Sequence, residues 1–494
     1  MQTNKPRNNS QSDSVKTSLY WNTLIRIPVQ AVTFVISIVV ARMLNPEDFG
    51  IIGIVMMLLG YANMFTNLGF NQAIVQKDIR DKRTLDSIFT IDFLISTLLA
   101  ALFYITSGQV AKFFKTPQCE SVLKVMTLVF VITSFYAVPH GILRRDLKFK
   151  TFALIETSQN LSTSALTLIL AILNLKYWAL AFGQLVPLAF ASIVFAIKAK
   201  WYPSIFYSHR QMKEVFDFGI WNFLRAQLVF VTQHIDKFFV GKWLGAFELG
   251  LYDKSKSLAG MLNNAVLINI NAVMFSNFSK NKNFPEQLQE DLKKALVLQS
   301  LIIFPVNVWL IVISPYFVHA LLGSKWDPMI LPFQVILVGS TFRNFDGLIT
   351  AMNIGAGKNR EQTLRVLIAV VALAISCLFL LKLGIKGVAW SFVVFSIILI
   401  ALGTLLTKSF IQISWKDIFR SVRCGLLSSL IMGLLVWSIS FFIQEHSIVN
   451  FVILSVIASV IYLALLVACP GEDVRQIRNE VLLDLKRKVG LDYD

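Results

Sequence analysis

Charged residues are scarce in this sequence. Asp, Glu, Lys and Arg make up only 15% of its 494 residues, whereas 55% are hydrophobic. A soluble chain of this length carries about a quarter charged residues and divides into several domains. The sequence also lacks a P-loop (GxxxxGKS/T), an HExxH motif and a CxxC pair, and its histidines are scattered. These absences argue against a soluble multidomain protein, and they leave no recognisable catalytic, cofactor-binding or metal-binding motif.

Apolar runs of about 20 residues, separated by short polar loops, dominate the sequence instead. This pattern is typical of a polytopic helical membrane protein, so we predict an all-α fold with about fourteen transmembrane helices. They are expected near residues 19–42, 48–71, 86–108, 121–140, 151–173, 177–197, 216–241, 248–275, 295–319, 329–353, 365–382, 386–407, 422–443 and 449–468.

Basic residues give the chain a net charge of +17, but they are spread along it rather than clustered as in a nucleic-acid-binding module. About 31 of the 46 lie on the side of the N-terminus, which is the asymmetry of the positive-inside rule. Arg365 is counted with one of the loops on that side of the membrane. We therefore place both termini in the cytoplasm and read the polar first 18 residues as a tail, not a signal peptide.

The segment Trp21–Lys82 recurs after 200 residues, with twelve ungapped identities between 21–83 and 221–283. We predict two six-helix lobes; an even number of helices per lobe relates them by an axis along the membrane normal. The expected organisation is a disordered cytoplasmic tail (1–18), an N-lobe (19–197), an interfacial linker (198–215), a C-lobe (216–407), two further helices (408–468) and a basic cytoplasmic tail (469–494).

Polar residues form stripes on the first two helices of each predicted lobe. On the first helix they recur every three or four positions from Asn22 to Ser37, so they share one face. Because lipid does not tolerate such a face, we expect a polar cavity between the lobes. The predicted substrate-cavity residues are Asn22, Arg26, Gln30, Thr33, Asn63, Asn67, Asn222, Arg225, Gln233 and Asn263.

Arg26 and Arg225 are the most informative of these residues. An arginine at mid-depth in a membrane segment costs about 2.5 kcal/mol or more and indicates function. A guanidinium also donates two hydrogen bonds at once to a diphosphate. The alternative is that both arginines lie near the cytoplasmic edge and extend to lipid headgroups.

Asp236, His234 and Glu156 are candidates for ion coupling or gating. Asp236 lies deep in its predicted helix, where it either pairs with a cavity arginine or binds a proton or cation. His234 fits a cavity wall better than a proton relay. For Glu156, and for Arg343 and Asp346 in the tenth helix, pairing between helices is favoured over substrate contact.

Several motifs resemble one membrane protein family. Residues 41–50 read ARMLNPEDFG, and further matches are LRRDLKF at 143–149, IETS at 155–158, YWAL at 177–180, DKFFVG at 236–241 and LGSKW at 322–326. Over about residues 19–407 the chain resembles the polysaccharide exporters (Wzx-type flippases) of the multidrug/oligosaccharidyl-lipid/polysaccharide (MOP) superfamily, especially the colanic-acid and teichuronic-acid exporter branch.

The resemblance implies a MATE-like fold and a flippase. Such a protein moves an undecaprenyl-diphosphate-linked oligosaccharide from the inner to the outer leaflet of the bacterial cytoplasmic membrane, by alternating access of two lobes. We accordingly expect membrane lipid, a coupling proton or sodium ion and polysaccharide polymerase or export machinery as partners, and neither nucleic acid nor a cofactor. One departure is the charge at Asp253, Lys254 and Lys256, which favours an acidic glycan or an external salt-bridge gate.

Three other functions remain open. A cation-coupled drug exporter of the same superfamily predicts a mostly acidic cavity, which Arg26 and Arg225 argue against. A membrane polymerase or ligase needs a large external loop, whereas the external loops expected here are short. A non-transporting scaffold would lack a charged cavity. We therefore expect a transporter rather than an enzyme.

Overall fold

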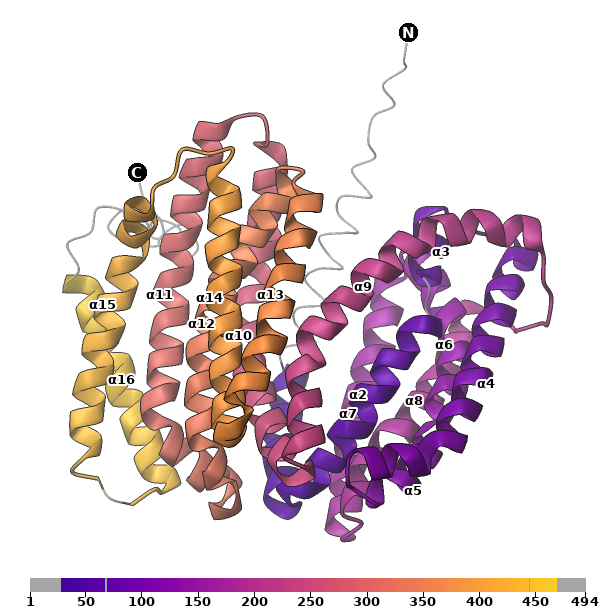
Figure 1. Ribbon diagram of the computed structural model, residues 1–494, viewed down its shortest axis with the longest axis horizontal. Coiled ribbons are helices and arrows are strands. Elements are labelled where there is room, and N and C mark those ends of the chain that lie inside the picture. Colours follow the sequence, from indigo (N-terminus) through magenta and orange to yellow (C-terminus); the bar gives the residue numbers. More distant parts are fainter. Residues whose placement is uncertain (1–27, 67–68, 444, 469–494) are drawn as a thin grey trace, which may run out of the picture. The chain divides into compact units, whose positions relative to one another are not determined.

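The computed structural model describes residues 28–66, 69–443 and 445–468; among these, 210–211, 213–226, 262, 264–273 and 276 are described by their backbone alone. All regular structure in this part of the chain is helical (Figure 1). Eight of its segments are long and apolar enough to cross a membrane. Each of the fourteen predicted helices coincides with one helix or two consecutive ones. The predicted all-α, multi-pass membrane fold is confirmed.

The chain divides into two compact units, Met1–Gly250 and Leu251–Asp494. The N-terminal unit contains helices Pro28–Met43, α2 (Pro46–Thr66), α3 (Phe70–Gln76), α4 (Lys82–Phe113), α5 (Gln118–Met126), α6 (Leu128–Arg145), α7 (Phe149–Ile172), α8 (Tyr177–Ala199) and α9 (His209–Trp243). The C-terminal unit contains most of α10 (Ala246–Lys280), then α11 (Pro285–Phe317), α12 (Ile330–Gly355), α13 (Asn359–Leu380), α14 (Gly384–Lys408), α15 (Trp415–Ser440) and α16 (Ile448–Ala468). The predicted six-helix lobes stay a prediction.

The segment between α8 and α9 packs on the start of α4. Trp201 is buried, and its ring lies 5.6 Å from that of Phe89. Ser204 Oγ donates a hydrogen bond of 2.6 Å to the buried carboxylate of Asp86. The backbone N–H groups of Phe206 and Ser208 donate to the hydroxyls of Thr90 and Ser87 at 3.0 and 3.1 Å. Polar side chains of α4 thus satisfy a non-helical backbone that would otherwise leave these groups unpaired. This packing explains why α9 begins within the N-terminal unit.

The starts of α2 and α10 meet through a pair of glycines. A Cβ atom at Gly50 would overlap the backbone carbonyl of Ala246, and one at Gly250 would overlap that of Pro46. Pro46 and Ala246, like Gly50 and Gly250, are mates at the 200-residue offset. The contact is therefore reciprocal between residues that are mates in the sequence repeat.

Helices α15 and α16 cover one side of α11 in the C-terminal unit (Figure 1). Their apolar contact is centred on Ile313, Met432 and Leu454, which are buried together. The Tyr316 hydroxyl of α11 lies within hydrogen-bond distance of two carbonyls that it can donate to, Ser440 at the end of α15 (3.0 Å) and Ile443 just after it (2.7 Å). The last two predicted helices are thus part of this unit's packed core.

Candidate functional site

The predicted polar stripe of the first helix is described only in part. Asn22 and Arg26 lie outside the described residues. Gln30 is exposed, and the Thr33 hydroxyl donates to its backbone carbonyl at 3.0 Å. The helix Pro28–Met43 therefore carries polar groups on a surface that the N-terminal unit does not bury.

Asn63 joins two helices of the N-terminal unit. Its Oδ1 accepts hydrogen bonds from Thr66 on α2 at 3.0 Å and from Thr133 on α6 at 3.3 Å. Gly60, one turn earlier, faces the Phe230 ring of α9, which a Cβ would approach to 3.1 Å. Asn67 lies outside the described residues. Asn63 thus acts here as a polar tie between α2 and α6.

Helix α9 carries five of the predicted residues. The side chains of Asn222 and Arg225 lie outside the described part of the chain. Gln233 is exposed, and the His234 ring stacks on Phe230 with 4.1 Å between centroids. Asp236 is fully buried, and one carboxylate oxygen accepts the backbone N–H of the following residue at 2.8 Å.

Glu156 lies on α7 opposite His140 of α6, with 4.0 Å between a carboxylate oxygen and the imidazole Nε2. The imidazole is packed among aromatic rings, with centroids 4.8 Å from both Tyr136 and Phe152. This arrangement agrees with pairing between helices. An open groove of about 560 Å³ runs between α7 and α8; it is mainly apolar, with Ser158, Gln159 and Ser162 among its lining residues. None of the predicted cavity residues lines that groove.

Asn263 is the predicted cavity residue that lies in the C-terminal unit, and it is buried there. Its Nδ2 donates to the Ala259 carbonyl at 2.8 Å, and its Oδ1 accepts from Asn344 Nδ2 at 3.0 Å. Gln299 of α11 donates to the backbone carbonyl of Asn344 at 2.8 Å. The amides therefore link α10, α11 and α12.

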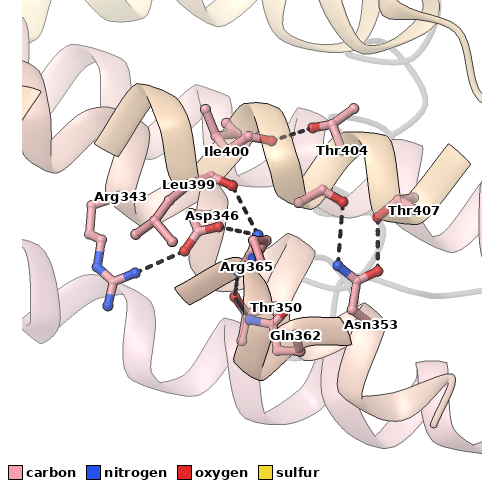
Figure 2. A network of polar contacts seen from close by, with 11 residues as sticks. Arg343, Asp346, Thr350, Asn353, Gln362, Arg365, Leu399, Ile400, Thr404 and Thr407 are labelled. Atoms are coloured by element: carbon pink, nitrogen blue, oxygen red, sulfur yellow. Dashed lines mark hydrogen bonds and ion pairs between the residues drawn. The ribbon is translucent and has the colours of Figure 1, made fainter. Parts of the chain in front are cut away.

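A buried ion-pair network adjoins these amides and joins α12, α13 and α14 (Figure 2). Asp346 is fully buried and accepts from Arg365 Nη1 at 2.7 Å and from Arg343 Nη1 at 2.8 Å. Arg365, only 4% exposed, also donates to the Leu399 carbonyl at 3.0 Å and the Thr350 hydroxyl at 2.7 Å. The Arg343 side chain keeps 41% of its surface exposed. One carboxylate therefore faces two guanidinium groups, leaving a net positive charge.

The network continues along the same helices (Figure 2). Asn353 accepts from the Thr407 hydroxyl at 3.0 Å, and Gln362 donates to Thr350 at 3.0 Å. A Cβ at Gly403 would overlap the guanidinium of Arg365, so the glycine makes room for that group on α14. Most polar atoms of this network find a partner within the apolar bundle, but the buried Arg365 Nε and Gln362 Oε1 have none among the described residues.

Sequence reasoning misplaced Arg365. It was predicted to lie in an inner loop, but α13 already begins at Asn359 and buries Arg365 against Asp346. The predicted pairing of Asp346 between helices is confirmed. The sequence does carry a signal for this pair. Asp346 and Arg365 lie on consecutive apolar helices, and each charge needs a partner within the bilayer. No group of three or more His, Cys, Asp or Glu able to hold a metal occurs in the described part of the chain.

The fold is that of the MOP-superfamily transporters. The solved structure of lipid II flippase MurJ in an inward closed conformation superposes with a TM-score of 0.75 at 17% identity, covering 90% of this chain and 97% of MurJ. An inward-facing MATE family transporter superposes with a TM-score of 0.60 at 18% identity, covering 80% and 98%.

The sequence profile described as "Polysaccharide biosynthesis protein" matches residues 39–331, and the chain belongs to this family. Teichuronic acid biosynthesis protein TuaB of Bacillus subtilis is 21% identical over 394 residues, 78% of this chain and 81% of TuaB. Lipopolysaccharide biosynthesis protein WzxC of Escherichia coli is 22% identical over 335 residues, 66% of each chain. The predicted family resemblance is confirmed.

Proposed function

We propose that this protein is a flippase that carries an undecaprenyl-diphosphate-linked oligosaccharide from the inner to the outer leaflet of the bacterial cytoplasmic membrane. The observation that carries the proposal is membership of the polysaccharide biosynthesis family, together with a transporter fold that extends over 90% of the chain. Both termini are assigned to the cytoplasm because the basic loops lie on that side.

The mechanism we propose is alternating access by the lobes at 19–197 and 216–407. Arg26 and Arg225 bind the diphosphate at the cytoplasmic entrance, because guanidinium groups form paired, charge-assisted hydrogen bonds with phosphate. Asn22, Gln30, Thr33, Asn67, Asn222 and Gln233 supply further polar contacts to the sugar, while Asn63 and Asn263 hold together the helices that line its path.

Ion coupling is proposed to involve Asp236, with His234 beside it and Glu156 in a gating role. A buried carboxylate that exchanges a proton or sodium ion can shift a transporter between two states, because the ion binds one state more tightly. Asp236→Asn is expected to remove the dependence of transport on the proton or sodium gradient. Unchanged gradient dependence would leave Asp236 as a structural residue.

A strain that lacks this gene tests the flippase proposal. Lipid-linked repeat units are expected to accumulate on the inner leaflet, and the wild-type gene to restore surface polysaccharide. Arg26→Ala and Arg225→Ala should fail to restore it, while Arg360→Ala, a change at an exposed arginine at the start of α13, should succeed. Normal export by the deletion strain would contradict the proposal. Loss of drug resistance alone would favour the drug-exporter alternative.

A further inference from the structure

The C-terminal unit presents a cation, Arg343, that is not among the residues of the proposed cavity. Arg343 lies at the middle of α12, about 20 Å along the axis from the helix's first residue at 1.5 Å per residue. Its partner Asp346 is shared with Arg365, which already neutralises that carboxylate. Arg343 is therefore the exposed cation of the network, with 41% of its side-chain surface accessible against 3% for Arg365. Figure 2 shows it at one edge of the network.

An aromatic pair on α14 lies between Arg343 and a second cation, Lys256 of α10. Phe392 and Phe395 lie 6.3 Å apart, centroid to centroid. Arg343 Cζ lies 5.8 Å from the Phe395 centroid, and Lys256 Nζ of α10 lies 5.3 Å from that of Phe392. Both distances are within the range of a cation–π contact. Lys256 lies about 15 Å along α10 from its first residue, and the two cations lie over neighbouring rings of α14.

The net charge of the network around Asp346 is positive. Arg343 and Arg365 share the carboxylate of Asp346, which leaves this network with one positive charge in surplus. Within the membrane, a surplus of this size needs an anion to offset it. A diphosphate ester supplies negative charge and several acceptor oxygens for the N–H donors of Arg343.

Arg343 has the geometry to bind such an anion. A guanidinium has five N–H donors. Only one of its nitrogens, Nη1, donates to Asp346, and among the described residues no other protein acceptor is bonded to Arg343. Because Asp346 is held by Arg365, and Arg365 by Leu399 and Thr350, the carboxylate that orients Arg343 cannot turn away.

We propose that Arg343 binds the diphosphate of the isoprenyl-diphosphate-linked substrate, with Lys256 supplying a second positive charge along the Phe392–Phe395 pair. Asp346 and Arg365 are positioning residues that fix the Arg343 guanidinium. The inference rests on the proposed function. It adds a substrate contact in the C-terminal unit, deep within α10 and α12, to the arginines proposed for the cytoplasmic entrance.

Binding of farnesyl diphosphate, a short isoprenyl diphosphate, to the purified full-length chain in detergent tests the inference. Arg343→Ala is expected to weaken binding about tenfold or more, equivalent to about 1.4 kcal/mol. Lys256→Gln should give a smaller loss, and Arg343→Lys an intermediate one, because it keeps the charge but not the paired donors. Arg360→Ala is the matched control and should bind as the wild type does.

Folding is monitored by gel-filtration elution and thermal midpoint. If Arg343→Ala does not fold, Arg343→Gln serves instead, because its amide still donates to Asp346. Asp346→Glu displaces the carboxylate without removing its charge, so it should weaken the binding of farnesyl diphosphate more than the binding of farnesol. Equal weakening of both would indicate a merely structural role and would overturn the positioning assignment.

Three competitors identify the source of the bound phosphate. Farnesyl monophosphate and inorganic pyrophosphate should each compete more weakly than farnesyl diphosphate. Displacement by phosphatidylglycerol at equal concentration would make Arg343 a lipid-headgroup anchor and overturn the inference. Unchanged binding by Arg343→Ala, or no binding by the wild type, would also overturn it. Export by the deletion strain remains the separate test of the flippase proposal.

Discussion

Helices α7 and α8 of the N-terminal unit and helices α13 and α14 of the C-terminal unit use the same packing device for different chemistry. In each pair a glycine on the second helix lets a polar side chain of the first approach the backbone closely. A Cβ at Gly183 would overlap the hydroxyl of Thr167, and one at Gly403 would overlap the guanidinium of Arg365. The space thus admits a neutral group in one unit and a charge in the other.

The buried charges of the two units therefore differ in kind. The N-terminal unit buries the carboxyl side chains of Asp48, Asp86, Asp92 and Asp236, whereas the C-terminal unit buries the Arg365 guanidinium together with Asp346. A threonine hydroxyl can satisfy its own helix, whereas a buried guanidinium requires a carboxylate, which Asp346 supplies. That carboxylate in turn holds Arg343, the half-exposed cation. The two units can therefore differ in the charge they offer to a substrate. The difference comes from the buried Asp346–Arg365 pair and not from the course of the backbone.

Arg365→Met is expected to have the largest effect on stability. It leaves Asp346 buried without its nearest partner, which typically costs about 3–5 kcal/mol. The thermal midpoint of the purified protein measures the loss, with Thr167→Val as the matched change in the N-terminal unit. The double change Arg365→Met with Asp346→Leu should recover most of the loss. A fall no larger than that of Thr167→Val would contradict the contrast between the units.

Gly403→Ala and Gly183→Ala compare the two close approaches directly. Overpacking a filled core typically costs about 1–3 kcal/mol. Gly403→Ala should lie at the upper end, because Arg365 is fixed by three acceptors, whereas Thr167 can rotate about χ1. Equal thermal midpoints for the two variants would show that the guanidinium is not held as tightly as its contacts indicate.

Asn63→Ala and Asn263→Ala should have the smallest effects. Hydrogen bonds between membrane helices average about 0.6 kcal/mol and reach about 1.7 kcal/mol. Asn263→Ala should cost more, because it also leaves Asn344 without its acceptor. Thermal midpoints again provide the measurement. A larger drop in thermal midpoint for Asn63→Ala than for Asn263→Ala would contradict the predicted order of the two effects.

The fold followed from the sequence because a bilayer restricts the choice of structure. Apolar runs of spanning length must form helices, since only helices satisfy their own backbone in lipid. Helix α9 begins at His209 rather than near 216, and α4 extends over Lys82–Phe113. Both extensions contain polar residues outside the apolar run, which hydropathy alone does not assign.

The site was less accessible to sequence reasoning. Polar periodicity identified Asn63 and Asn263, which the structure places in interhelical hydrogen bonds. It assigned Arg365 to a loop, because a basic residue at the edge of an apolar run fits the positive-inside rule equally well. Which carboxylate meets which arginine depends on how helices pack side by side, and periodicity along one helix carries no such information.

Translocation in proteoliposomes tests the central claim most directly. The purified chain is reconstituted with a fluorescent isoprenyl-diphosphate-linked disaccharide in both leaflets, and a membrane-impermeant quencher is added outside. Vesicles with the wild-type chain should lose nearly all fluorescence, while protein-free vesicles and those with Arg343→Ala should keep the inner-leaflet half. Protection of that half by wild-type vesicles, with the protein folded and inserted, would contradict the claim that this chain flips lipid-linked sugars.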